Sequence, residues 1–324
     1  MTIFKPLSKI VLASVLACLA LTKPVLAADN WPSGPVKLVV PIDVGVAQDV
    51  LARRLAHELQ SIWGQTVNVV NQPGAAGTLG TLTVANSTPD GHTIGLIAAP
   101  FTGTLATRSD LPYTRDKLHG VIKFGLQDFF IFANVQAPFN NAREMISFAK
   151  TNPGKLSFAS PGIGSYVHIT MEHLMMLQNL NMIHVPYKNL QQALPDIMGD
   201  RLDMLLTTAN PGVDGLITKG DIKIIASLGD NAMHRGKPVE SISKVDTKVA
   251  THGYYALIVP QGTSQTVIDK IQRDVVSIVN KSEFRQQMLA LGTRPSIDLD
   301  FNRWIDQEVG RLKTKIKQAN IKIQ

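Results

Sequence analysis

The sequence predicts an α/β protein of two lobes with a ligand cleft between them. Short apolar, β-branched runs alternate with amphipathic stretches, which is typical of parallel sheets covered by helices. This alternation occurs in two parts of the chain of similar size. A length of 324 residues fits about two domains, and a 44% share of hydrophobic residues is sufficient to build their cores.

In the first part, strands are expected at 36–40, 67–70 and 93–98, because each is a short run rich in valine, isoleucine or leucine. Helices are expected at 49–60 and 78–86. Within 49–60 the apolar residues recur three or four positions apart, so they share one helix face. The order strand, helix, strand, helix, strand indicates a parallel arrangement.

The second part repeats this order and then ends in helices. The expected strands are 130–135, 156–159, 182–185, 202–206, 222–227 and 255–259. The expected helices are 142–150, 166–178, 190–198, 267–279, 282–291 and 301–318. In open α/β sheets, ligands bind beyond the carboxyl ends of the strands. The loops that follow the strands are therefore where we look for a site.

Three of these loops carry glycine and precede a helix: the first loop (41–49), the second loop (71–77) and the third loop (160–165). A helix N-terminus offers unpaired N–H groups and a positive dipole end, which together favour an anion. Glycine allows a ligand to approach the backbone closely. One such loop could simply be a tight turn, but three of them in both halves predict an anion held from both sides.

The N-terminal 27 residues are typical of a secretory signal. Lys5 and Lys9 precede an apolar run at 10–21, and small residues end the segment at Ala27. The run is shorter than the roughly 20 residues that span a bilayer. We therefore expect export to the periplasm and cleavage after Ala27. Cys18, the single cysteine of the chain, lies inside this segment, so the mature chain would hold no disulfide. A lipoprotein anchored at Cys18 remains the alternative.

Charge and motifs exclude several classes of function. Without its three N-terminal lysines the chain's charge falls from +7 to +4 (7 − 3), and 6% aromatic residues do not indicate a nucleic-acid binder. Gly162 and Gly164 form only half of a dinucleotide fingerprint. His168 and His173 are five apart and do not share a helix face, so no metal site is predicted. His184 is interpreted as structural. No nucleophile motif or acid–base pair occurs, so neither a catalytic residue nor a cofactor is predicted.

Several segments in order resemble a known family. They are 38–41 (LVVP), 71–77 (NQPGAAG), 88–93 (TPDGHT), 153–156 (PGKL), 159–165 (ASPGIGS) with His168, 184–188 (HVPYK) and 319–322 (ANIK). The chain resembles the Bug-type extracytoplasmic solute-binding proteins, the receptors of tripartite tricarboxylate transporters. This resemblance implies a two-lobed type II periplasmic-binding-protein fold. Lobe 1 would comprise 28–130 and 253–324, and lobe 2 would comprise 131–252.

The resemblance also implies a small carboxylate held between the lobes, largely by backbone amides and bridging water. The implied ligand-binding residues are Asp43, Val44, Gly45, Asp49, Gly74, Ala75, Ala76, Gly77, Ala99, Phe101, Ser160, Gly162, Gly164, Ser165, His168 and Thr207. The family's first loop usually reads Pro-Pro-Gly-Gly, where this chain has 43–46 (DVGV), and its usual Asp-Asn is replaced by Thr207 and Thr208. Asp43 either selects a ligand less anionic than the usual dicarboxylates or is a solvated turn residue.

The implied partners are the organic acid and the membrane subunits of a transporter, with the chain itself a monomer that contacts no nucleic acid. Two other functions stay open at this point. The chain could serve a sensor kinase without transport, or it could be a secreted enzyme acting on small acids. The second would need a convergent acid–base pair, which the sequence does not show.

Overall fold

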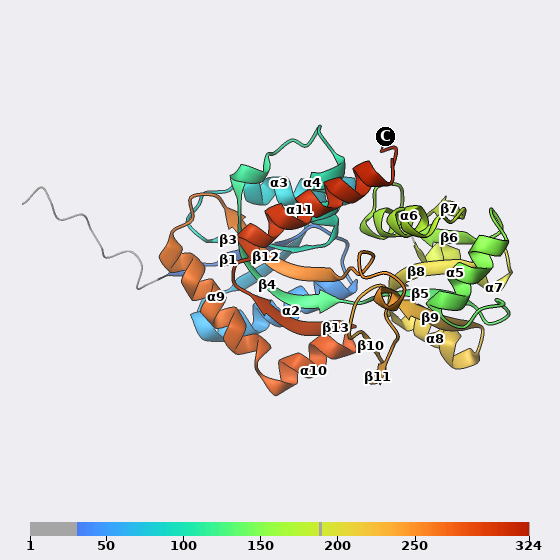
Figure 1. Cartoon of the computed structure of the whole chain (residues 1–324). Coiled ribbons are helices and arrows are strands. Elements are labelled where there is room, and N and C mark those ends of the chain that lie inside the picture. The colour runs from blue at the N-terminus through green and yellow to red at the C-terminus, as the bar shows by residue number, and fades with distance from the viewer. Residues whose placement is uncertain (1–30, 188–189, 324) are drawn as a thin grey trace, which may run out of the picture.

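The structure is a computed structural model, and it describes residues 31–187 and 190–323. Figure 1 shows two sheets, each covered by helices, joined side by side. We call the unit with the six-stranded sheet lobe 1 and the unit with the five-stranded sheet lobe 2. The predicted α/β class with two lobes is confirmed.

Lobe 1 has the strand order β13-β4-β12-β3-β1-β2. Its strands are β1 (Val36–Val40), β2 (Val67–Asn71), β3 (Thr93–Ala98), β4 (Leu118–Gln127), β12 (Gly253–Pro260) and β13 (Thr293–Asp298). β1 pairs in parallel with β2 and β3, whereas β12 is antiparallel to both β3 and β4. β4 therefore runs in the same direction as the three parallel strands, and all four end at the same edge.

Helices cover both faces of this sheet. They are α2 (Ala47–Trp63), α3 (Thr78–Ala85), α4 (Pro100–Thr107), α9 (Gln265–Val279), α10 (Ser282–Ala290) and α11 (Phe301–Gln318), with 3-10 turns at Ala75–Gly77 and Arg115–Lys117. Successive residues of a strand point to opposite faces. Leu38 accordingly packs with α2 and α9, whereas Val39 packs with α3, α4 and α11.

Lobe 2 has the strand order β7-β6-β8-β5-β9. Its strands are β5 (Phe129–Asn134), β6 (Ser157–Ser160), β7 (Ile183–Pro186), β8 (Met204–Thr208) and β9 (Ile222–Ser227), and a small hairpin joins β10 (Met233–His234) to β11 (Lys237–Pro238). Its helices are α5 (Ala142–Thr151), α6 (Tyr166–Gln178), α7 (Leu194–Met198) and α8 (Pro211–Lys219), with 3-10 turns at Leu190–Ala193 and Ile242–Lys244. Apolar clusters fill both faces of this sheet as well.

The chain crosses between the lobes twice, and the two crossings lie side by side. Asp128 alone separates β4 from β5, and His252 immediately precedes β12. Gly253, the first residue of β12, pairs with Gln127, the last residue of β4. The resemblance placed the first crossing near Phe130, which here is already the second residue of β5.

Some elements were not expected from the sequence, and each has a physical reason. β4 contains Lys123, whose ammonium is buried in an ion pair with Asp298 (3.3 Å) and lies 4.4 Å from the Trp304 ring centroid. β13 contains Pro295, which is tolerated because this strand lies at the sheet edge. α4 and α8 are rich in residues with low helix propensity, including glycine and threonine. The helix expected at 190–198 begins as a 3-10 turn and becomes α7.

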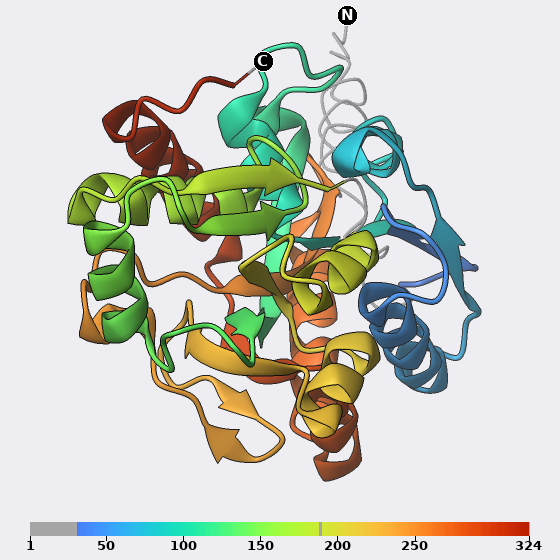
Figure 2. The same cartoon turned by 90° about the vertical axis from the view of Figure 1, so that its right-hand side faces the viewer.

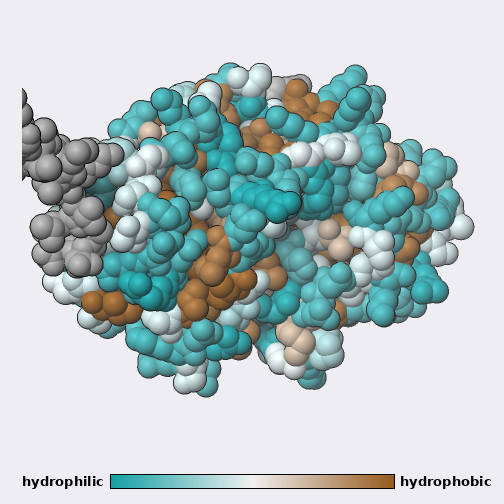
Figure 3. Space-filling view, turned by 60° about the vertical axis from the view of Figure 1, so that its left-hand side comes forward, coloured by the Kyte–Doolittle hydropathy of each residue, from teal (hydrophilic) through white to brown (hydrophobic). Residues whose placement is uncertain are grey.

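Figure 3 shows one face, on which a short band of hydrophobic residues crosses a largely polar surface. Within the described ranges, no helix combines the length and apolar character needed to cross a membrane.

Candidate functional site

The strand ends of the two sheets face each other across the crossings. β4 ends at Gln127 and β5 begins at Phe129, so the carboxyl edge of the lobe 1 sheet meets the beginning of β5. Phe129 pairs with Thr208, the last residue of β8, and β8 is parallel to β6 and β6 to β7. The loops that follow β1, β2 and β3 in lobe 1 therefore lie toward those that follow β6 and β8 in lobe 2.

The first loop is fixed by a buried carboxylate. Asp49, 2% exposed, accepts the Gly45 amide at 2.9 Å and the side chain of Asn71, also at 2.9 Å. Arg53 pairs with it at 3.0 Å. Burial alone would raise the pKa of Asp49, but these hydrogen bonds and the Arg53 charge lower it below its usual value. The carboxylate of Asp49 is thus engaged within the protein, and it shapes the loop that carries Asp43.

The second loop has an unusual backbone. Four successive residues, Gly74 to Gly77, have positive φ angles of 121°, 48°, 55° and 88°. The two alanines adopt a left-handed conformation that costs roughly 1–2 kcal/mol each. Glycine is required nearby too, since a Cβ on Gly80 would lie 2.8 Å from Pro41. Gly77 of the second loop also lies against Pro41, the residue that follows β1, since a Cβ there would be 3.4 Å from the Pro41 Cβ, while Ala75 and Ala76 are exposed at the tip of the loop.

The third loop is built around Ser160, which is fully buried. Its hydroxyl lies 2.7 Å from His184 Nε2 and accepts the Gly162 amide at 3.1 Å. The Gly164 amide donates to His168 Nδ1 at 3.2 Å, and the Ser165 hydroxyl caps α6 by accepting the His168 amide. The Ser165 amide donates to the Gly162 carbonyl at 3.1 Å, so the amides of Gly162, Gly164 and Ser165 are all used by the protein itself.

Two histidine rings lie against each other next to the third loop, tilted by 34°. The ring centroids of His168 and His184 are 4.1 Å apart, and His168 Nε2 lies 3.4 Å from a Glu172 carboxylate oxygen. Burial, and then the neighbouring His168, lower the pKa of His184 to about 4. His184 is therefore neutral near pH 7, and it acts as a hydrogen-bonding partner of Ser160 rather than as a cation.

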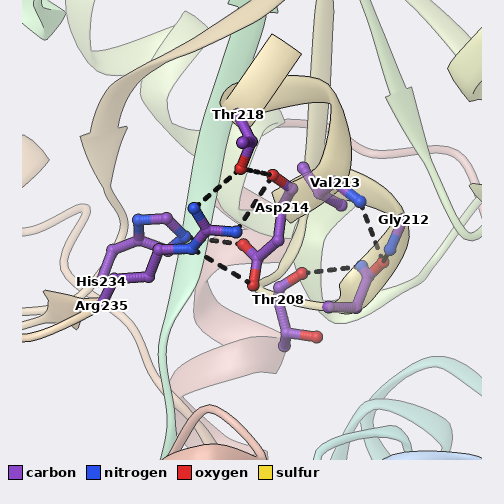
Figure 4. A network of polar contacts seen from close by, with 8 residues as sticks. Thr208, Gly212, Val213, Asp214, Thr218, His234 and Arg235 are labelled. Atoms are coloured by element: carbon purple, nitrogen blue, oxygen red, sulfur yellow. Dashed lines mark hydrogen bonds and ion pairs between the residues drawn. The ribbon is translucent and has the colours of Figure 1, made fainter.

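The start of α8 is held in a polar network, shown in Figure 4. Asn210 accepts the amides of Gly212 (3.1 Å) and Val213 (3.3 Å), which caps the helix. Farther along, Asp214 lies 2.8 Å from His234 Nε2, while Arg235 donates to Thr218 at 2.9 Å. This network joins α8 to the β10–β11 hairpin, and its cap occupies the amides that an anion would need at this helix start.

The sequence-predicted residues fall into two groups. The side chains of Ala99, Phe101, Ser160 and His168 are buried, at no more than 5% exposure, so a ligand between the loops could reach these residues only through their backbone. Thr207 is partly buried and pairs with Phe130. The exposed residues at the facing loops are Asp43, Val44, Gly45, Gly74, Ala75 and Ala76, whereas Gly77, Gly162 and Ser165 are partly buried and Asp49 and Gly164 are buried.

The facing loops carry no cationic side chain: segments 42–49, 73–78, 98–102, 160–165 and 207–210 contain neither lysine nor arginine. The acids in these segments are the anchored Asp49 and the exposed Asp43. An anion bound here would depend on backbone amides and helix dipoles. Within the described part of the chain, no group of three metal-ligating side chains is close enough together to hold an ion.

A family model described as "Tripartite tricarboxylate transporter family receptor" matches residues 51–321. The chain belongs to this receptor family. It is therefore a periplasmic binding protein of the Bug type and not an enzyme, as the sequence predicted.

The relatives of this receptor agree with that assignment. Protein BugT of Bordetella pertussis is 26% identical over 305 residues, which cover 92% of the receptor and 93% of BugT. The structure of the periplasmic binding protein BugD has a TM-score of 0.72 at 26% identity and covers 91% of the receptor and 100% of BugD. An R. palustris protein described with adipate has a TM-score of 0.76 at 22% identity, with 90% and 99% covered, and shows the same fold.

Two features of the receptor's site escaped the sequence reasoning. Thr78 Oγ1 is buried at the start of α3 and, within the described residues, makes no hydrogen bond, so it is available to a ligand or a water. His184 and Glu172 support the third loop through His168 and Ser160. A polar residue after a glycine loop could have suggested Thr78, whereas His184 is 24 positions from Ser160 and no local pattern joins them.

Proposed function

We propose that this receptor captures a small organic carboxylate between its lobes and presents it to the membrane subunits of a tripartite tricarboxylate-type transporter. The observation that carries the proposal is the meeting of glycine-containing strand-end loops from both sheets, each followed by a helix N-terminus and none carrying a lysine or arginine. Such loops bind an anion through amides and dipoles.

The comparisons support the chemical class of this ligand. The R. palustris relative is described with adipate, a dicarboxylate. In this receptor the second loop presents exposed backbone at Ala75 and Ala76, and the third loop contributes the start of α6. A carboxylate reaching both loops would bridge the lobes and favour the state in which they are close together.

The decisive experiment is a ligand screen by thermal unfolding, followed by calorimetry. Mono-, di- and tricarboxylates and amino acids would be tested on the purified receptor. A compound at 100 times its Kd stabilises a protein by about 2.7 kcal/mol, which is readily detected. Small-angle scattering should then show compaction with the compound that binds. Failure of every carboxylate to stabilise the protein would contradict the proposal.

We further propose that the receptor is exported as a monomer and cleaved after Ala27, a position outside the described residues. Mass spectrometry of the periplasmic protein should find Ala28 at the N-terminus. A mature chain that begins at a lipidated Cys18 would instead establish the lipoprotein form.

A further inference from the structure

Helices α6 and α11 lie against each other where lobe 2 meets lobe 1, as Figure 2 shows from the side of lobe 2. Tyr166 and Ile169 of α6 belong to the same apolar cluster as Leu312 of α11. We call this contact the α6–α11 seam. Its members are Tyr166, Ile169, His173, Glu308, Arg311, Leu312 and Lys315.

One half of the seam is fully hydrogen-bonded. The Tyr166 hydroxyl donates to Glu308 Oε1 at 2.5 Å, and Arg311 donates to both oxygens of Glu308 at 2.6 and 2.7 Å. Arg311 also donates to Thr251, next to the second crossing, at 3.1 Å. Tyr166 directly follows the third loop, so its bond to Glu308 ties that loop to lobe 1.

The third loop also touches lobe 1 directly. A Cβ placed on Gly164 would lie 3.4 Å from Thr107 of α4 and 3.8 Å from Ile323, near the end of the chain. The third loop therefore lies against α4 and against the chain that follows α11.

The other half of the seam contains two buried nitrogen atoms that have no hydrogen-bond partner among the described residues. Lys315 and His173 are each 4% exposed, and within the described residues neither Lys315 Nζ nor His173 Nδ1 has a hydrogen-bond partner. Burial, and then the charge of Arg311, lower the pKa of Lys315 from 10.5 to about 8. Burial, and then Lys315, lower the pKa of His173.

The charged groups around Lys315 do not neutralise its ammonium. Glu308 and Arg311 face it from its own helix and His173 faces it from α6, while Asp246 acts on His173. The Glu308 carboxylate is already held by Arg311 and Tyr166. A buried ammonium without its own counter-ion disfavours the packed arrangement, because separating the helices would return it to water.

We propose that Lys315 is a positioning residue that disfavours the packing of α6 against α11. Tyr166 and Glu308 hold the third loop to lobe 1, and the charged ammonium of Lys315 promotes release of that loop. The seam is thereby balanced between two states. Ligand capture can then be favoured or disfavoured by a residue outside the facing loops.

The sign and size of the effect follow from linkage. Lys315 binds its proton more weakly in the packed seam than in water, by roughly 300-fold for a pKa of about 8 against 10.5. Its charge therefore favours separation fully below pH 8, and the effect is lost as pH rises toward 10.5. The equilibrium constant for separation of α6 from α11 should fall about tenfold between pH 7 and pH 9. His173, with its lowered pKa, stays neutral throughout this interval.

The test measures seam separation in ligand-free protein with a single thiol. Ile169→Cys buries a thiol in the seam, and Cys18→Ser removes the other one. The rate of alkylation by iodoacetamide, divided by that of free cysteine at the same pH, reports how often the seam separates. With Lys315 present, this ratio should fall about tenfold from pH 7 to pH 9. Lys315→Met should lower the ratio at pH 7 and abolish its pH dependence.

Matched variants separate this effect from others. Lys313→Met removes a charge from an exposed position of the same helix and should behave like the parent. Tyr166→Phe should raise the ratio at every pH. A thiol at Leu174, buried in the lobe 2 core, reports unfolding of lobe 2 and should not follow the same pH profile. If Lys315→Met does not fold, Lys315→Gln carries the same expectation.

Three results would overturn the proposal: a pH-independent ratio with Lys315 present, equal effects of Lys313→Met and Lys315→Met, or a parallel change at the Leu174 thiol. Since the experiment uses no ligand, its outcome is separate from that of the carboxylate screen.

Discussion

Asp128 and His252 stand 124 positions apart in the chain, and their side chains meet where it passes between the lobes, with Asp128 Oδ1 3.2 Å from His252 Nδ1. Arg294 of β13 donates to both oxygens of Asp128 at 2.7 Å. One buried carboxylate therefore joins both crossings to the lobe 1 sheet. Burial would raise the pKa of Asp128, but the hydrogen bonds from His252 and Arg294 outweigh it and lower the pKa.

Asp128→Asn should destabilise the protein by about 3 kcal/mol at pH 7, because it leaves the Arg294 charge without its carboxylate. A lowered pKa contributes stability above the unfolded value of 3.8, and that contribution is lost as pH falls through the folded value. The difference between the two proteins in urea unfolding should therefore shrink below pH 4. Asp269→Asn, on the exposed surface of α9, is the control, and an equal difference at pH 7 and pH 3 would contradict the role of Asp128.

Gly229→Ala should displace His252, since a Cβ at Gly229 would lie 2.1 Å from the His252 ring. We expect a loss of about 1–3 kcal/mol in unfolding free energy. Gly310→Ala in α11, where a Cβ meets nothing within 4 Å, should be neutral or slightly stabilising. In a His252→Ala background, Gly229→Ala should cost little. Full additivity of the two changes would show that the ring is not the cause.

Asp49→Asn should loosen the first loop, because Asn71, Arg53 and the Gly45 amide all depend on that carboxylate. The expected loss is about 1–2 kcal/mol, with faster hydrogen exchange at the Gly45 amide. The pKa of Asp49 is lowered, so the difference from the parent should disappear in acid. Unchanged exchange at Gly45 would mean that the loop is held in some other way.

Asp43→Asn tests selection of the ligand. Asp43 is exposed on the first loop, where a bound carboxylate would be repelled. If Asp43 faces the ligand, the variant should bind dicarboxylates several-fold more tightly and amino-bearing compounds more weakly, as measured by calorimetry. Asp269→Asn serves as the remote charge control. An identical ranking of ligands in Asp43→Asn and the parent would make Asp43 a solvated turn residue.

Gly164→Val tests the third loop. Gly164 has a φ of 76°, which a β-branched residue adopts only with strain, and a Cβ there approaches Thr107. We expect carboxylate binding to be abolished while the circular dichroism spectrum is retained. Gly215→Val in α8, which has open space around it, should still bind. Normal binding by Gly164→Val would remove the third loop from the site.

The sequence predicted the parallel strands because apolar residues dominate each short run, with a single interruption at Lys37 in β1 and at Gly95 in β3. It did not predict β4, in which glycines and Lys123 interrupt the run, because the pairing of Lys123 with Asp298 is a tertiary contact. Glycine and the strand–loop–helix order likewise marked the three loops.

Local patterns could not show which groups of those loops remain open to a ligand. The Asp49 carboxylate is hydrogen-bonded to Asn71, 22 positions away, and the Ser160 hydroxyl to His184, 24 positions away. The contacts of Asp128 with His252 and Arg294 span 124 and 166 positions. Hydrophobic periodicity records which face of an element is buried, and it carries no information on partners this distant.

The place of β12 at the centre of the lobe 1 sheet has a consequence for the order in which the chain can fold. Lobe 2 is one continuous stretch, 129–252, and its sheet is complete before β12 has been made. The first four strands of lobe 1, by contrast, are synthesised without the strand that joins β3 to β4. Until residue 260 emerges, those two edges have unpaired backbone groups that can pair with other chains. Lobe 2 can thus complete its fold during synthesis or export, whereas lobe 1 must wait for residues 253–324.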